Sequence, residues 1–193
     1  MAEAKAKVIV VGPVNAGKTR LANQIANFES EPNFDTYSPT AGARILEFDR
    51  EISHAGKRGG SRAVSLAVEL WDCSGDKQYE ACWPAILANV VGVILVFNPE
   101  QPGHDREIGK WYSAFIAKLQ LAPSQVLTLA HHKEPPEAFN RTAPPKGLQD
   151  FHLVDTALDG AQAVAEMRAA VDDFLTKVGA IALEKHEKEL DNL

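Results

Sequence analysis

Cysteine is scarce in this sequence. Only Cys73 and Cys82 occur among 193 residues, so a disulfide framework is not indicated and a reducing, cytoplasmic compartment fits the composition. No cysteine lies near the C-terminus, and Ala2 rather than glycine follows Met1, which excludes prenylation and N-myristoylation by the usual motifs. We therefore expect the protein to reach a membrane only through a partner.

Long apolar runs and surplus positive charge are also missing. No run is long enough to cross a bilayer, and residues 1–12 lack the apolar region and cleavage site of a signal peptide. The formal net charge is −6, which argues against nucleic acid as the main partner. With 45% apolar residues, the chain fits one globular domain. We expect residues 1–180 to form this domain and residues 181–193 to be a charged tail.

Strand-like and helix-like segments alternate along the chain. The strand-like segments are residues 7–12, 43–48, 65–71, 90–98, 124–132 and 152–157. Helical spacing of apolar residues follows Lys18, recurs near Trp111 and returns after Val164. This order predicts an α/β fold, with a mostly parallel sheet and helices on both of its faces. The second and third segments predict one antiparallel edge hairpin, with the polar, glycine-rich residues 51–62 as its loop.

A phosphate-binding motif joins the first strand to the first helix. The segment "GPVNAGKT", from Gly12 to Thr19, matches G-x-x-x-x-G-K-[ST] in the context that this motif requires. Its glycines permit the tight path that turns amide N–H groups toward phosphate. We predict that Lys18 reaches the outer phosphates and that the Thr19 hydroxyl binds Mg²⁺. The alternative is a glycine-rich turn that binds nothing.

A second cluster fits the metal end of such a site. Asp72 follows a predicted strand, and Gly75 lies three residues later, so the carboxylate can bind Mg²⁺ while the glycine amide approaches a third phosphate. Thr40, in the polar loop after the first helix, can place its hydroxyl on the same metal. Alone, Asp72 would also fit an ordinary turn after a strand, but the order of the motifs favours the metal site.

Several short blocks extend the likeness beyond these motifs. They are "YSPTAGARILEF", "ELWDCSGD", "CWPAI", "VFNPEQPGH", "WYSAF" and "LAHHK". Through them the chain resembles the Ras-type small GTPases of the Rab-like group along nearly its whole length, and more narrowly the Rab-like small GTPases of intraflagellar transport. The resemblance implies a six-stranded sheet, GTP or GDP with Mg²⁺ as ligands, and a monomer when alone. It further implies docking on coiled-coil subunits of the intraflagellar transport B complex, in the cilium or flagellum and at its base.

The same resemblance assigns the ligand contacts. It assigns Mg²⁺ to Thr19, Thr40 and Asp72, and the degenerate catalytic position to Asp76. It assigns the nucleotide to Gly12, Val14, Asn15, Ala16, Gly17, Lys18, Thr19, Arg20, Pro39, Thr40, Gly75, His132, Lys133, Thr156, Ala157 and Leu158.

The base-reading motif of Ras-type proteins, Asn-Lys-x-Asp, is altered here. Placing His132 and Lys133 on Asn-Lys puts Pro135 where the aspartate should be, whereas a shift by one residue brings Glu134 there and loses the lysine match. The backup motif Ser-Ala-Lys reads Thr156-Ala157-Leu158, whose central amide could still donate to the guanine carbonyl. Because one buried polar contact contributes on the order of 1–3 kcal/mol, we expect a weaker preference for guanine.

The adjacent His131 and His132 allow two interpretations. Neighbouring strand residues point to opposite faces, so the pair is a poor metal site. The pair either ends a strand with one ring half-buried, or contacts the base or the ribose.

Two positions predict very slow hydrolysis. Asp76 stands where a water-orienting glutamine is expected, and a carboxylate cannot donate a hydrogen bond and adds negative charge beside the phosphates. Val14 stands where small GTPases carry glycine, and its bulk hinders a partner's arginine. We therefore expect a nucleotide-dependent binding module. The alternatives are a GTPase that needs a residue from a partner, a P-loop kinase, for which no arginine-rich lid appears, and a scaffold without nucleotide.

Aromatic residues in or beside the predicted switch loops are candidate anchors for a partner. They are Tyr37, Phe48, Tyr79 and Trp83. Tyr79 is the preferred contact, and the alternative for Trp83 is packing against the sheet.

Overall fold

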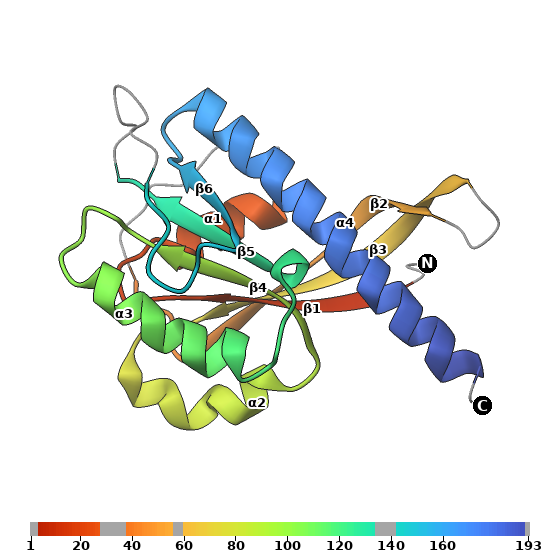
Figure 1. Ribbon diagram of the computed structural model, residues 1–193, viewed down its shortest axis with the longest axis horizontal. Helices are drawn as coiled ribbons and strands as arrows, with labels where there is room; N and C mark the ends of the chain where they lie inside the picture. The colour runs from red at the N-terminus through yellow and green to blue at the C-terminus, as the bar shows by residue number, and fades with distance from the viewer. Residues whose placement is uncertain (1–3, 28–37, 56–59, 134–141, 192–193) are drawn as a thin grey trace.

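The protein is built on one six-stranded sheet. A computed structural model describes residues 4–27, 38–55, 60–133 and 142–191, and the strand order is β2-β3-β1-β4-β5-β6 (Figure 1). The strands are β1 (Ala4–Val11), β2 (Ala43–Ala55), β3 (Ser61–Cys73), β4 (Val90–Phe97), β5 (Val126–His131) and β6 (His152–Thr156). Among these strands, β2 and β3 pair in antiparallel fashion, and all other neighbours are parallel. The predicted sheet, with its antiparallel edge hairpin, is confirmed.

Helices cover both faces of this sheet. They are α1 (Lys18–Ala26), α2 (Trp83–Leu87), α3 (His104–Trp111) and α4 (Ala161–Asp191). Two short 3₁₀ segments, η1 (Lys77–Cys82) and η3 (Pro123–Gln125), and a π-helical segment, η2 (Tyr112–Ala117), complete the described elements. The helices α1 and α4 lie on one face, and α2 and α3 on the other (Figure 1). Within the described residues, no helix is both long and apolar enough to cross a membrane.

The strand β1 is buried on both of its sides, as its apolar run predicts. Val8 and Val10 face the core formed with α1 and α4, whereas Ile9 and Val11 face the core formed with α2 and α3. All four side chains are fully buried. Such burial is typical of a central strand in a parallel sheet, and it fixes the loop after β1 at the carboxyl edge of the sheet.

The hairpin strands are longer than the sequence predicts. Residues 51–62, predicted as a loop, contribute the last residues of β2 and the first of β3. Ile52 pairs with Val64, and both side chains are buried. Gly179 of α4 makes room for Ile52, because a Cβ atom there would collide with the Ile52 side chain. The loop prediction was wrong because the polar composition of residues 51–62 gave no sign of the backbone pairing across the hairpin that buries Ile52.

The helix α4 crosses the predicted domain boundary without a break. Ala182 and Leu183 are buried in the core that α4 shares with α1, whereas the side chains of residues 184–189 are mostly exposed. The division into a domain of residues 1–180 and a charged tail stays a prediction.

Candidate nucleotide site

The loop between β1 and α1 follows a path that needs glycine at two positions. Gly12 has a φ of 147° and Gly17 a φ of 88°, values that side chains disfavour. A Cβ atom at Gly12 would collide with the Val96 carbonyl oxygen, and one at Gly17 with the His131 ring. The loop therefore lies directly against the ends of β4 and β5. The helix α1 begins immediately after it, with the positive end of its dipole at the loop.

Lys18, the first residue of α1, is 7% exposed. Its ammonium group donates hydrogen bonds to the carbonyl oxygens of Gly12 at 2.9 Å and Pro13 at 2.7 Å. Burial lowers the pKa of Lys18 to about 8, although the nearby carboxylate of Asp72 opposes this effect. An anionic ligand beside this ammonium would stabilise its charged form, so the arrangement suits phosphate.

Three oxygen-bearing side chains converge beside Lys18. Asp72, the penultimate residue of β3, is completely buried, and its Oδ2 atom accepts hydrogen bonds from Thr19 at 2.7 Å and from Thr40 at 3.4 Å. The two threonine hydroxyl oxygens lie 2.8 Å apart. Burial raises the pKa of Asp72, against the opposing effect of these hydrogen bonds and of the neighbouring cations.

The free coordinating capacity of this cluster fits a hard cation. Within the described residues, the buried Oδ1 atom of Asp72 has no hydrogen-bond partner, which is costly unless a ligand satisfies it. Carboxylate and hydroxyl oxygens are ligands that Mg²⁺ accepts, together with water and phosphate oxygens. Among the residues that the structure describes, no group of three histidine, cysteine or acidic side chains could bind a metal. Asp72 is the one carboxylate of this cluster, and P-loop nucleotide sites place a single acidic residue of this kind beside Mg²⁺.

Arg44 is a member of this cluster that the sequence analysis missed. It lies directly opposite Asp72 in the β2–β3 register. Its guanidinium is 3.5 Å from the Asp72 carboxylate and donates a 2.7 Å hydrogen bond to the Asn23 side chain. Arg44 therefore compensates part of the buried negative charge. The sequence could have indicated this role of Arg44 only through a correct prediction of the hairpin register.

Gly75 lies against the phosphate loop, as its predicted role requires. A Cβ atom at this position would be 2.6 Å from the Val14 nitrogen and 2.7 Å from the Lys18 ammonium. Such distances leave no room for a side chain without displacement of the loop. The segment after β3 thus approaches the loop at Val14 and Lys18.

Asp76, the predicted degenerate catalytic position, is hydrogen-bonded within its own 3₁₀ segment. Its carboxylate caps η1 by accepting hydrogen bonds from the Gln78 backbone and side-chain amides, both at 3.0 Å. Both residues are exposed. The side chain at the predicted catalytic position is therefore engaged with its own 3₁₀ segment.

His131 is buried and connects the predicted base-reading segment to the phosphate loop. It is 5% exposed, and its ring contacts the position where a Gly17 side chain would lie. Burial lowers the pKa of His131 to about 4, so the ring is neutral at physiological pH.

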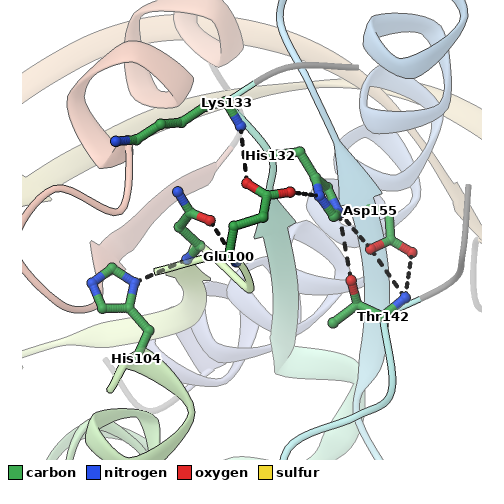
Figure 2. A network of polar contacts seen from close by, with 7 residues as sticks. Glu100, His104, His132, Lys133, Thr142 and Asp155 are labelled. Carbon is green, nitrogen blue, oxygen red and sulfur yellow. Dashed lines mark hydrogen bonds and ion pairs between the residues drawn. The ribbon is translucent and has the colours of Figure 1, made fainter. Parts of the chain in front are cut away.

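His132 is held by carboxylates on both sides (Figure 2). Its Nδ1 atom lies 2.5 Å from Glu100, and its Nε2 atom lies 2.9 Å from Asp155, which also accepts a 3.1 Å hydrogen bond from the Thr142 backbone. Burial alone would lower the pKa of His132, but the two carboxylates outweigh it and raise the pKa. Both ring nitrogens are thus engaged within the protein.

The histidine pair differs from the predicted strand end with one half-buried ring. His131 and His132 are both buried, at 5% and 6% exposure. Lys133 is exposed, and its side chain is directed away from His132 (Figure 2). Glu134 and Pro135, the two alternatives for the guanine-reading position, lie outside the described residues.

The remaining predicted contacts fall into an exposed and a buried group. Val14, Asn15, Arg20 and Pro39 are exposed, whereas Ala16, Thr156, Ala157 and Leu158 are buried. Thr156 ends β6 opposite His131 in the register. The segment 156–158 therefore lies beside the end of β5, where a backup base motif belongs.

Two of the predicted partner anchors contribute to the cores. Trp83 contacts the rings of Trp111 and Phe115, with centroids 5.3 and 4.8 Å apart, and Phe48 packs against the core with α1 and α4. This packing favours the structural alternative for Trp83. Tyr79 is half-buried, and Tyr37 lies outside the described residues.

Comparison with known proteins identifies the family. Residues 7–133 match the family described as Ras of Complex, Roc, domain of DAPkinase. Over 186 residues, the chain is 40% identical to an intraflagellar transport protein 22 homolog from Danio rerio, with 96% of each chain covered. The chain belongs to the intraflagellar transport protein 22 family. To the family member of Trypanosoma brucei brucei it is 30% identical, across 98% of this chain and 93% of that protein.

Solved structures of the family share the fold. One is the GTP-bound crystal structure of T. brucei IFT22/74/81, with a TM-score of 0.64 and 29% identity over 91% of this chain and 98% of that one. Another is GDP-bound T. brucei IFT22, with a TM-score of 0.62 and 29% identity over 89% and 96% of the respective chains. The predicted resemblance to small GTPases of intraflagellar transport is confirmed.

Proposed function

We propose that this protein binds GTP and GDP with Mg²⁺ and hydrolyses GTP very slowly. The observation that carries the proposal is the convergence of Thr19 and Thr40 on the buried Asp72, whose second carboxylate oxygen has no partner among the described residues. GTP-bound and GDP-bound structures of family relatives support the choice of nucleotide.

Each residue of the loop has a distinct task in this proposal. The backbone amides between Gly12 and Thr19 surround the phosphates, and the Lys18 ammonium exchanges its two carbonyl partners for phosphate oxygens. Thr19, Thr40 and Asp72 hold Mg²⁺, and Gly75 lets its own amide approach the third phosphate. Bound Mg²⁺ neutralises charge on the outer phosphates.

The slow hydrolysis follows from the state of Asp76. Its carboxylate caps η1, accepts but does not donate hydrogen bonds, and adds negative charge near the phosphates. Val14, 44% exposed on the loop, stands where a partner's arginine would enter. The alternative is an active GTPase whose partner supplies the missing catalytic residue. The intact phosphate-binding loop disfavours an empty scaffold, and a P-loop kinase is disfavoured because the sequence shows no arginine-rich lid.

We further propose that the protein is a nucleotide-dependent subunit of the intraflagellar transport B complex. In this role it docks on coiled-coil subunits in the cilium or flagellum and at the ciliary base. The T. brucei complex named IFT22/74/81 supports this assignment, as do the names of the relatives from animals and trypanosomes.

The nucleotide content of the purified protein tests the proposal. Denaturation followed by chromatography should release GTP. Release of GDP alone would favour turnover, and an adenine nucleotide or an empty protein that binds none on addition would refute the proposal. Competition among GTP, ATP and XTP then measures how strongly the altered segment around His132 discriminates the base.

Chelation tests the metal ligands separately. EDTA should weaken GTP binding by the native protein, whereas Asp72→Asn should bind GTP more weakly and respond little to EDTA. Lys5→Ala is a suitable control, since Lys5 pairs with Glu69 on the exposed surface. Equal EDTA sensitivity of the native protein and Asp72→Asn would show that Asp72 does not hold the metal.

A further inference from the structure

His104, the first residue of α3, reaches the phosphate loop from the other face of the sheet. It is 6% exposed, and its Nδ1 atom accepts a 3.1 Å hydrogen bond from the Asn98 backbone N–H. The proton of the neutral ring therefore lies on Nε2, which is 3.2 Å from the Val14 carbonyl oxygen and donates to it. Burial lowers the pKa of His104 and so favours this neutral ring.

This hydrogen bond fixes the orientation of one peptide group in the loop. The carbonyl of Val14 and the N–H of Asn15 belong to the same trans peptide, so they point in opposite directions. With the carbonyl held by His104, the Asn15 N–H is directed away from α3. Asn15 has a φ of 63°, a left-handed conformation that asparagine adopts more readily than most residues other than glycine.

The fixed peptide lies at the outer end of the loop. Gly75 approaches the Val14 nitrogen and the Lys18 ammonium so closely that a Cβ atom would contact both. In the proposed function, Gly75 and Lys18 both face the third phosphate. Gly75 thus contacts the Pro13–Val14 peptide. The Val14–Asn15 peptide that His104 fixes is the next one along the loop, so we infer that it lies beside the outer phosphates rather than beside the ribose.

We propose that His104 is a positioning residue for the nucleotide. By holding the Val14 carbonyl, it turns the Asn15 N–H toward the outer phosphates and favours the triphosphate over the diphosphate. This inference rests on the proposed function, and it assigns a ligand-dependent role to a residue on α3 that does not itself touch the nucleotide. A purely structural role, in which His104 only ties α3 to the turn at Asn98, is the competing explanation.

Two substitutions separate the two hydrogen bonds. In His104→Asn, the amide oxygen can replace Nδ1 as acceptor for Asn98, but the side chain is too short to reach Val14. In His104→Gln, the amide nitrogen can replace Nε2 as donor to Val14, while the Asn98 bond is lost. Each variant keeps one bond. A purely structural role predicts that His104→Asn, which keeps the Asn98 bond, behaves like the native protein, and that His104→Gln is the impaired variant.

The test measures affinity for fluorescent analogues of GTP and GDP on both variants and on the native protein. His104→Asn should bind the GTP analogue about tenfold more weakly, because one oriented donor is lost, and should bind the GDP analogue within about threefold of native. His104→Gln should stay within about threefold of native for both. Melting temperatures report any common loss of stability. His104→Leu, which makes neither bond, replaces the asparagine variant if that variant does not fold.

The outcomes distinguish this inference from the proposed function. If the native protein binds neither analogue, the proposed function fails, and the inference fails with it. If the native protein binds both, the inference alone is refuted by an unchanged GTP affinity in His104→Asn. It is equally refuted if the asparagine and glutamine variants lose GTP and GDP affinity to the same extent.

Discussion

The two ends of the candidate site differ in how their carboxylates are paired. At the phosphate end, defined here as residues 12–19 with Thr40, Asp72 and Gly75, hydroxyls and a carboxylate converge and one buried oxygen is left without a partner in the described residues. At the base end, defined as residues 131–133 with Glu100 and Asp155, both nitrogens of the central imidazole are already bound to carboxylates. The phosphate end thus leaves a carboxylate oxygen available to a cation. The base end pairs its carboxylates internally, and within the described residues the only buried polar side-chain atom that it leaves without a hydrogen-bond partner is the Nδ1 atom of His131.

This difference indicates where binding free energy comes from. Hydrogen bonds to charged groups contribute about 1.5–3 kcal/mol each, and the phosphate end offers several. At the base end, the carboxylates of Glu100 and Asp155 are already paired with His132, so we expect this end to add less. Affinity should depend chiefly on the number of phosphates and on Mg²⁺, and only weakly on the base.

The largest effect should follow from Lys18→Ala. This change removes the only ammonium group that lies in the described phosphate end, and GTP binding should weaken by about 100-fold or more, given about 1.4 kcal/mol for each factor of ten. Equilibrium titration with a fluorescent GTP analogue measures the loss. Lys177→Ala, which removes an exposed α4 lysine paired with Asp173, is the control. A loss below threefold would mean that the phosphate end is not the main source of affinity.

His131→Asn should make the protein less sensitive to acid. Burial lowers the pKa of His131 from 6.5 to about 4. Between these two pH values the unfolded chain therefore binds a proton at His131 that the folded protein does not bind. The resulting stability is fully present above pH 6.5 and is lost as the pH falls toward 4. At pH 5 the loss amounts to about 2 kcal/mol.

Urea unfolding of the native protein and of His131→Asn, at pH 7 and pH 5, checks this prediction. The free energy of unfolding should fall more for the native protein than for the variant, because other titrating groups are common to both. Parallel losses would indicate that His131 titrates normally and that the base end is open to water.

His132→Leu should destabilise the fold more than it affects the ligand. The change leaves Asp155, with a side chain only 10% exposed, without its imidazole partner, which should lower the free energy of unfolding by about 1–2 kcal/mol. GTP affinity of the folded protein should stay within about threefold, since the phosphate end is untouched. The converse result, intact stability with lost GTP binding, would make His132 a base-reading residue and overturn the contrast between the two ends.

Asp76→Gln should have the smallest effect. Glutamine restores a donor at the catalytic position, but Asp76 now caps η1 through Gln78, and no partner arginine is present. We expect single-turnover GTP hydrolysis to rise by less than about tenfold, or about 1.4 kcal/mol in the barrier. A native rate equal to that of an ordinary small GTPase would contradict the slow-hydrolysis proposal.

The sequence predicted the phosphate end better than the base end for a physical reason. The loop from Gly12 to Thr19 is contiguous, and Asp72 and Gly75 are separated by three positions, so the backbone itself encodes their geometry. Glu100, His132 and Asp155 come from the ends of three different strands. Their meeting depends on the order β4-β5-β6 and on the strand register, which a short motif does not contain.

The contrast between contiguous motifs and tertiary contacts also explains the other features that the sequence did not predict. Arg44 and Asp72 meet only through the hairpin register, and the full length of the hairpin depends on α4, which buries Ile52 through the close approach of Gly179. His104 meets Val14 across 90 positions of sequence. Each of these contacts is tertiary, whereas local patterning correctly predicted the fold class and the edge hairpin.

The close approach of Gly179 has a mechanical consequence. With 13 residues each, β2 and β3 extend about 40 Å at about 3.3 Å per residue. Asp72 lies at one end of this pair of strands, and the region near the other end packs against α4. A protein that binds α4 near Gly179 would therefore contact the helix that packs on the same pair of strands as Asp72. A bulkier residue at Gly179 should push α4 away from these strands at a point far from the candidate site.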